Sequence, residues 1–124
     1  MLKPYLYVDK TSYASRGVFT KEKIAADIII EISPVIVMDN DDRQHLDKTK
    51  LHDYIFEWDQ DSKKCCLALG YVSIYNHSFA ANCEYEMDFN DETIQIKTRC
   101  FVKSGEELFI NYNGEWNNAK KLWF

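Results

Sequence analysis

The sequence has no apolar run long enough to cross a membrane. Apolar runs are short, such as the three isoleucines at 28–30, whereas a spanning helix needs about 20 consecutive apolar residues. Residues 1–10 also lack the apolar stretch of a secretory signal peptide. We therefore expect an intracellular protein with no membrane partner, located in the cytoplasm, or in the nucleus if its source is eukaryotic or viral.

Metal-binding and disulfide patterns are missing as well. The four cysteines, Cys65, Cys66, Cys83 and Cys100, form no C-x-x-C pair, and the two adjacent ones fit poorly around one metal ion. None of the three histidines stands at a zinc-site spacing. We expect no metal site, and we expect reduced, mostly buried thiols of the kind found inside cells.

Positive charge is in short supply. The chain has 15 Lys and Arg against 20 Asp and Glu, a formal net charge of −5, and non-specific nucleic-acid binding depends on cationic side chains. We therefore expect no direct binding to nucleic acid. An acidic surface suits a basic, lysine-containing protein partner, although the same mild acidity also serves simply to keep proteins soluble.

What the chain does have is the composition of one globular domain. Its 124 residues, 46% hydrophobic and 28% charged, suffice for a single hydrophobic core. No repeat, linker or low-complexity tract divides the sequence, so we expect one domain over residues 1–124. Aromatic residues reach 15%, and aromatic side chains are favoured both in strands and around ligand pockets.

Short β-type segments dominate the pattern, so the predicted fold is mainly β with little helix. Pro34 separates two apolar runs and predicts two consecutive strands. A polar stretch at 39–50 has no apolar periodicity and predicts a surface insertion with one helical turn. Outside the C-terminal third, the segments expected as strands are 5–8, 17–19, 28–32, 35–38, 54–58 and 66–68.

The C-terminal third carries the clearest local signal. Residues 84–89 and 93–97 alternate polar and apolar side chains with period two, and turn-forming residues join them. This pattern predicts a β-hairpin with one buried face. In the last strand Leu108, Ile110 and Tyr112 should share one face, and residues 117–124 form a short tail.

Two motifs are the candidate functional elements. The tripeptide N-H-S at 76–78 follows an apolar segment and precedes Asn82-Cys83, and the tetrapeptide G-E-E-L at 105–108 leads into Tyr112. Taken alone, such a tripeptide is most often a turn whose polar side chains form hydrogen bonds with nearby backbone groups. Likewise, a tyrosine near the end of a strand is commonly half-buried packing.

Taken together, the two motifs resemble the C-terminal signatures of SET-domain protein-lysine methyltransferases, in the family's order and at a typical separation. The segment 15–19, S-R-G-V-F, resembles the family's glycine-rich turn, with Ser15 in place of its first glycine. Ala81 replaces a proline that the family usually has, and Glu31 is expected to be structural.

The resemblance covers residues 5–116 and implies a SET-domain, β-clip-like fold of small β-sheets with a threaded C-terminal segment. The family's zinc-binding cysteines after the last motif are absent. Residues 39–50 stand as an insertion in this core.

The resemblance also implies an activity. The cofactor is expected to be S-adenosyl-L-methionine, and the methyl group is expected to pass to the side-chain amine of a lysine on a basic protein. Tyr112 is the expected catalytic residue. The expected cofactor-binding residues are Arg16, Gly17, Tyr75, Asn76, His77 and Trp116. The expected walls of the substrate-lysine channel are Tyr54, Tyr71, Tyr75 and Tyr112.

Alternatives stay open at this level. Tyr54 fits a core aromatic of its strand better than a channel wall, and Trp116 equally fits ordinary packing of the tail. The chain as a whole also fits a catalytically weak SET-like domain that acts as a protein- or cofactor-binding module, or an unrelated β-rich binding module with Tyr112 on a flat face. A chain this short is also compatible with a homodimer that uses residues 39–50 as a contact.

Overall fold

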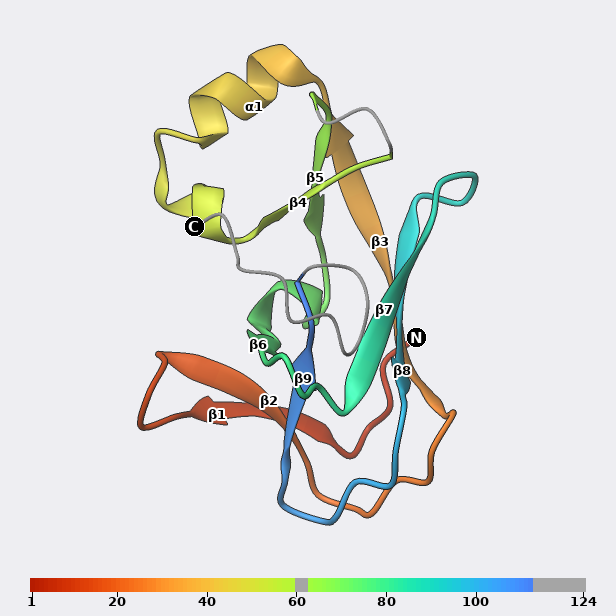
Figure 1. Cartoon of the computed structure of the whole chain (residues 1–124). Helices are drawn as coiled ribbons and strands as arrows, with labels where there is room; N and C mark the ends of the chain where they lie inside the picture. Colours follow the sequence, from red (N-terminus) through yellow and green to blue (C-terminus); the bar gives the residue numbers. More distant parts are fainter. Residues whose placement is uncertain (60–62, 113–124) are drawn as a thin grey trace.

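Residues 1–59 and 63–112 are the part of the chain that the computed structural model describes. Within that part, nine strands form two small sheets, and one α-helix and two short 3-10 helices accompany them (Figure 1). The prediction of a mainly β fold with little helix is confirmed.

The first sheet brings the two ends of the described chain together. Its strand order is β1-β2-β9-β6, where β1 is Leu6–Lys10, β2 is Arg16–Thr20, β9 is Glu107–Ile110 and β6 is Asn76–His77. Strands β1, β2 and β9 pair antiparallel, whereas the short β6 runs parallel to β9. The two sequence motifs are therefore neighbours in one sheet.

The second sheet contains the predicted hairpin. Its order is β4-β5-β3-β8-β7, where β4 is Ile55–Glu57, β5 is Cys65–Ala68, β3 is Ile29–Met38, β8 is Thr93–Thr98 and β7 is Cys83–Asp88. Strands β7 and β8 pair antiparallel along their whole length, from Cys83↔Thr98 to Asp88↔Thr93. The Asp88 carboxylate accepts from the backbone N–H groups of Asn90 and Asp91, at 3.0 and 2.9 Å, and so closes the turn.

The predicted break at Pro34 is wrong, because β3 runs continuously through it. The strand changes partner at this residue: Ile29 to Pro34 pair with β8, and Val35 to Met38 pair with β5. Proline has no N–H to give to a ladder. Its carbonyl is still used, since it accepts from the N–H of Leu69 at 3.0 Å.

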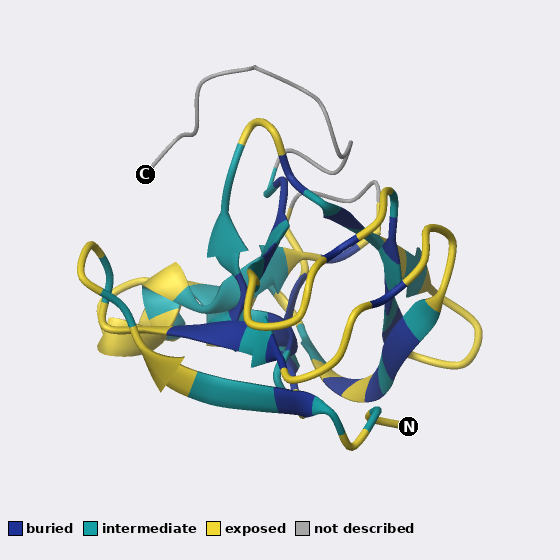
Figure 2. Cartoon of the chain, turned by 90° about the horizontal axis from the view of Figure 1, so that it is seen from below, coloured by how far each residue is buried: buried dark blue, intermediate teal, exposed yellow. Residues whose placement is uncertain are grey.

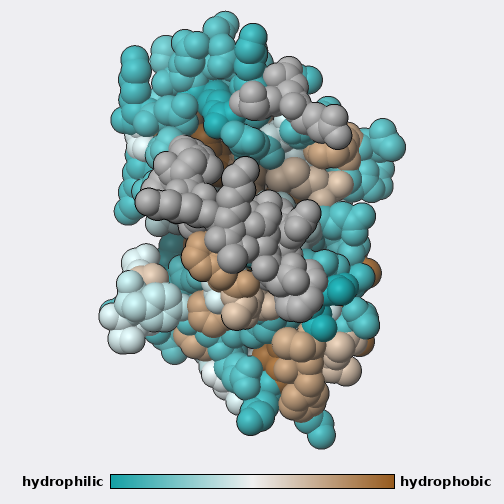
Figure 3. All heavy atoms as spheres, in the orientation of Figure 1, coloured by the Kyte–Doolittle hydropathy of each residue, from teal (hydrophilic) through white to brown (hydrophobic). Residues whose placement is uncertain are grey.

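The polar insertion folds into more helix than one turn. It contains α1 (Asn40–Leu46), which the Asp39 side chain caps, and it runs into the 3-10 helix η1 (Lys50–Asp53). None of the residues of α1 is buried, and the part of the surface around α1 is hydrophilic in Figure 3. No residue of 39–50 is buried, so this stretch lies at the surface of the described structure.

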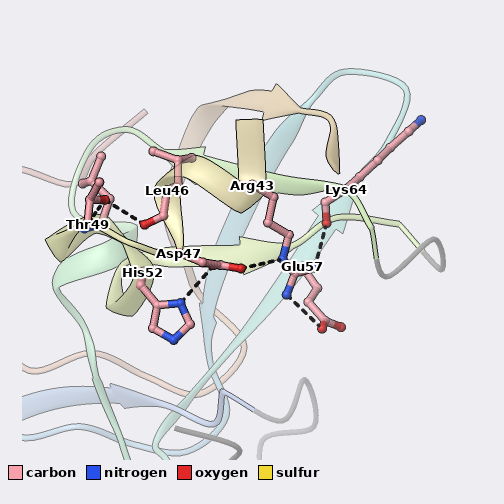
Figure 4. A network of polar contacts seen from close by, with 8 residues as sticks. Arg43, Leu46, Asp47, Thr49, His52, Glu57 and Lys64 are labelled. Carbon is pink, nitrogen blue, oxygen red and sulfur yellow. Dashed lines mark hydrogen bonds and ion pairs between the residues drawn. The ribbon is translucent and has the colours of Figure 1, made fainter. Parts of the chain in front are cut away.

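A polar network holds this insertion against the second sheet. The Arg43 guanidinium lies 3.4 Å from Glu57 of β4 and 3.5 Å from the Lys64 carbonyl, and it also faces Asp47 (Figure 4). Asp47 in turn lies 2.9 Å from Nδ1 of His52 in η1. The network therefore ties the end of η1, which precedes Tyr54, to a fixed framework.

The core lies between the sheets. Ile94 and Ile96 of β8, and Leu108 and Ile110 of β9, are 0% exposed, and full burial of one such side chain contributes about 1.5–3 kcal/mol. Figure 2 shows buried positions gathered on the strands and exposed ones on the surrounding loops. The regular alternation predicted through Tyr112 ends at Ile110, because Asn111 is also buried.

The segment 76–82 runs beside β9, as the threaded arrangement implied by the resemblance requires. Besides the parallel pairing of β6, Ser78 N–H donates to the Ile110 carbonyl at 3.1 Å. The Asn82 side chain donates to the Glu107 carbonyl at 2.9 Å and accepts from the Phe109 N–H at 2.8 Å. One side chain thus satisfies two backbone groups of β9 and fixes its register.

Candidate functional site

A cavity of about 410 Å³ lies where both motifs meet. This volume falls in the range of roughly 300–1,000 Å³ that is usual for small-molecule sites. Four separate stretches of sequence contribute its walls. The lining residues are Tyr13, Ala14, Ser15, Arg16, Asp53, Tyr54, Ser73, Ile74, Asn76, His77 and Tyr112.

Tyr112 is held by its neighbours at one side of this cavity. Its hydroxyl donates to the Tyr75 carbonyl at 2.6 Å, and its backbone N–H donates to Nδ1 of His77 at 3.0 Å. Burial, together with the charges of Tyr54 and Tyr85, raises the pKa of Tyr112 to about 12. The phenol therefore stays protonated at ordinary pH and acts as a hydrogen-bond donor.

His77 connects the first motif to Tyr112. Because Nδ1 accepts the Tyr112 N–H, the neutral ring carries its proton on Nε2. Burial lowers the pKa of His77 below its ordinary 6.5, which favours the neutral ring. Among residues 1–59 and 63–112, buried Nε2 has no hydrogen-bond partner, and the ring packs edge-on against Phe79.

Acidification is expected to weaken the fold at His77. Protonation places a hydrogen on Nδ1, which then opposes the Tyr112 N–H. Because the folded-state pKa is lowered, this stabilisation is fully present above pH 6.5 and is lost as the pH falls through the folded-state pKa. The slope contributed by this one proton is at most about 1.4 kcal/mol per pH unit, and it is measured from the free energy of unfolding between pH 7.5 and 5.

His77→Asn removes the titrating group and keeps a side-chain acceptor, so most of this slope should vanish in that variant. His52→Gln is the matched control, because His52 is the partner of Asp47 in the exposed insertion. Equal slopes in the wild type and in His77→Asn would contradict the assignment.

Asn76 is anchored between the first strand pair and β9. Its Nδ2 donates to the Arg16 carbonyl at 2.8 Å and to Oε2 of Glu107 at 2.8 Å. Gly17 makes this packing possible, because a Cβ on Gly17 would lie 2.4 Å from Oε2 of Glu107 and 3.0 Å from Nδ2 of Asn76. The absence of a Cβ at Gly17 therefore allows the close approach of Glu107 and Asn76.

The residues expected to form the lysine channel divide into two groups. Tyr54 and Tyr112 line the cavity. The Tyr75 ring does not, since it is 0% exposed in the core and its hydroxyl donates to Glu31 at 2.9 Å. The part of Tyr75 that reaches the site is its carbonyl oxygen. Tyr71 packs against the core and is not a lining residue.

Of the expected cofactor-binding residues, Arg16, Asn76 and His77 line the cavity, and Gly17 lies directly behind it. Trp116 lies outside the described residues. The cavity is also lined by residues that the sequence did not point to, namely Tyr13, Ala14, Asp53, Ser73 and Ile74. Ser73 ties two walls together, because its hydroxyl donates to the Tyr54 carbonyl at 2.9 Å.

No group of His, Cys, Asp or Glu within residues 1–59 and 63–112 could hold a metal ion. No helix in the same residues is long and apolar enough to span a bilayer. The four cysteines are free, and all but Cys100 are buried, as predicted.

Comparison with known proteins adds independent information. The family model for the SET domain matches residues 15–113. A histone-lysine N-methyltransferase of Schizosaccharomyces pombe, specific for H3 lysine-37, is 33% identical over 125 residues, which span 100% of this chain and 80% of that protein.

Solved structures share the fold. A candidate histone methyltransferase from Plasmodium falciparum superposes with a TM-score of 0.72 at 27% identity, over 94% of this chain and 98% of that chain. Apo ctPRC2 with substitutions in Ezh2 gives a TM-score of 0.75 at 19% identity, over 95% of this chain and 16% of that chain. The second likeness shows the fold alone.

These matches exclude the alternative of an unrelated β-rich binding module. The motifs, the threaded β9 and the family match agree over nearly the whole chain. The chain therefore belongs to the SET-domain family and is, by class, a protein-lysine N-methyltransferase.

Proposed function

We propose that this chain binds S-adenosyl-L-methionine in the cavity beside Asn76 and uses Tyr112 to direct methyl transfer to a lysine of a basic protein. One observation carries the proposal: Asn76 and Tyr112, which come from separate motifs, line the same cavity. The family in general uses this donor, and the residues in this chain suit it.

The donor fits the lining residues chemically. Arg16 lines the cavity, and a guanidinium is a suitable cation for the donor's carboxylate. Because Gly17 has no Cβ, Asn76 and Glu107 can pack closely against it at the edge of the cavity. When bound, the donor supplies an electrophilic methyl group on a positively charged sulfur.

The chain's own residues prepare the lysine. An ordinary lysine has a pKa of about 10.4, and its amine must be neutral to react. The aromatic rings of Tyr54 and Tyr112 disfavour the ammonium form by desolvation. The protonated Tyr112 hydroxyl and the Tyr75 carbonyl, 2.6 Å apart, lie where they can orient the amine and the methyl hydrogens.

Gly17→Ala is expected to weaken donor binding by about tenfold or more. The new Cβ would overlap with Glu107 and crowd Asn76, and overpacking of this kind typically costs about 1–3 kcal/mol. Isothermal calorimetry with S-adenosylhomocysteine measures the effect.

Gly105→Ala adds the same methyl group where nothing lies within 4 Å, at a backbone φ of +86°. It should lower stability and leave donor affinity unchanged. If both variants lowered donor affinity equally, crowding at Glu107 and Asn76 would not be the cause.

A histone is the first substrate to test. The S. pombe relative acts on H3 lysine-37 by its name, and the net charge of −5 suits a basic tail. We extend the proposal to a nuclear location and to a homodimer in which the hydrophilic insertion around α1 contacts a second copy. Sedimentation of the purified chain tests the second point.

The deciding experiment incubates the protein with methyl-labelled donor and with histone H3 or a mixture of basic proteins, followed by mass spectrometry of modified lysines. Calorimetry with S-adenosylhomocysteine runs in parallel. Methylated lysine together with donor binding supports the proposal. Donor binding without methylation of any protein would favour the catalytically weak binding module, and no donor binding would remove the proposed role of the cavity.

A further inference from the structure

We infer that Glu107 is a positioning residue for the donor: it holds the Asn76 amide so that Oδ1 serves as the acceptor for the donor's ammonium group, and Tyr13 fastens Glu107 from the outer side. This inference rests on the proposed function, because the donor named there is the ligand.

The orientation of the Asn76 amide follows from its partners. Nδ2 lies 2.8 Å from the Arg16 carbonyl and 2.8 Å from a Glu107 carboxylate oxygen. These two partners only accept hydrogen bonds, so the nitrogen must be the atom on that side. Nδ2 also lies 3.4 Å from the Tyr13 hydroxyl oxygen. Both of its hydrogens are then used, and the hydrogen-bonding capacity left to this side chain is that of Oδ1. Asn76 lines the cavity, so a ligand there meets an acceptor.

Glu107 is itself held from two directions. Its Oε1 accepts the Tyr13 hydroxyl, and its Oε2 accepts Nδ2 of Asn76. The Tyr13 ring stacks on Phe109 with centroids 6.5 Å apart. Burial and the bond to Glu107 raise the pKa of Tyr13 to about 12, so this hydroxyl remains a donor. The carboxylate therefore has one oxygen for each partner.

The negative charge of Glu107 makes the site prefer a cationic ligand group over a neutral one. A carboxylate that accepts from an amide N–H polarises the amide and makes its carbonyl oxygen a stronger acceptor. The same negative charge stands close to the cavity wall and favours a cation over a neutral donor. The donor's α-ammonium is the cationic N–H group that fits, while its carboxylate is suited to Arg16.

The test compares two ligands on three proteins. S-adenosylhomocysteine carries the ammonium group, and its deaminated analogue lacks only that group. Calorimetry should show that Glu107→Ala weakens binding of the first ligand by about 10–100-fold, the range for hydrogen bonds to charged groups. The same variant should change binding of the deaminated analogue by less than about threefold. Glu106→Gln, at the exposed neighbouring carboxylate, should match the wild type with both ligands.

Two further variants separate positioning from loss of structure. Glu107→Gln keeps an oxygen for Nδ2 of Asn76, and the Tyr13 hydroxyl can turn to accept from the new amide, so this variant should recover part of the lost affinity. Tyr13→Phe keeps the ring on Phe109 and should cost less than Glu107→Ala.

The inference is overturned if Glu107→Ala binds both ligands as the wild type does, or loses both in parallel, which is the pattern of a merely structural role. If the wild type binds neither ligand, the proposed function fails and the inference fails with it. Both the proposed function and the inference are supported if the wild type binds S-adenosylhomocysteine more tightly than the deaminated analogue and Glu107→Ala binds the two ligands equally.

Discussion

Tyr112→Phe is expected to lower methyl transfer by about 100-fold or more while donor affinity stays within about threefold. The substitution removes one hydroxyl from the cavity wall, where it donates to the Tyr75 carbonyl at 2.6 Å. Loss of one preorganised donor at a reacting centre typically costs about 10²–10³ in rate. The backbone bond from Tyr112 to His77, at 3.0 Å, survives the change, so the wall itself should persist.

The measurement combines single-turnover methylation of the substrate with calorimetry on the same preparation. Tyr85→Phe is the matched control, because the Tyr85 hydroxyl donates to the Tyr112 carbonyl at 3.3 Å and Tyr85 is not a cavity-lining residue. Turnover that is equal in Tyr112→Phe and in the wild type would contradict the proposed catalytic role of Tyr112. A parallel loss of donor binding would mean that the hydroxyl shapes the donor site instead.

Glu31→Ala is expected to lower the free energy of unfolding by about 3–5 kcal/mol. Glu31 is 0% exposed and accepts three hydrogen bonds. They come from the Ser33 hydroxyl at 2.6 Å, the Tyr71 N–H at 2.8 Å and the Tyr75 hydroxyl at 2.9 Å. Each buried donor left without an acceptor costs about 1–3 kcal/mol. A domain of this size has only about 5–15 kcal/mol in total.

Urea denaturation followed by tryptophan fluorescence measures the change. Glu31→Gln is the conservative control: its oxygen can serve Ser33 and Tyr71, and the Tyr75 hydroxyl can accept from its NH₂ group, so it should cost clearly less. Gly70→Ala is a second test of the Glu31 contacts, because its Cβ would lie 2.3 Å from Oε2 of Glu31 and should lower the free energy of unfolding. Unfolding curves of Glu31→Ala that overlay the wild type would show that these bonds do not support the core.

Glu31 also has a functional consequence. It links β3 to Tyr71 and Tyr75, the residues that lead into the first motif. The Tyr75 carbonyl in turn accepts the Tyr112 hydroxyl. The expectation of a structural role for Glu31 agrees with its buried contacts, and those contacts connect β3 to the residue whose carbonyl accepts the Tyr112 hydroxyl.

Local patterns predicted the elements whose signal lies within a few residues. The hairpin β7–β8 follows from period-two alternation and turn-forming residues, and both depend only on neighbouring side chains. Pro34 was misleading because its effect depends on whether a partner strand needs its N–H. That need is absent where β3 changes from β8 to β5.

The sequence by itself determined the strand-rich class, the family and the two motifs that contain Asn76 and Tyr112, because these are properties of short, contiguous patterns. Only the tertiary structure decided which tyrosines reach the cavity: it placed the Tyr75 ring in the core and brought Tyr13 to Glu107, 94 residues away. Patterns among neighbouring residues in the sequence do not predict these placements. A side chain's environment depends on which distant segments pack against it, and here the passage of β9 beside residues 76–82 sets that packing.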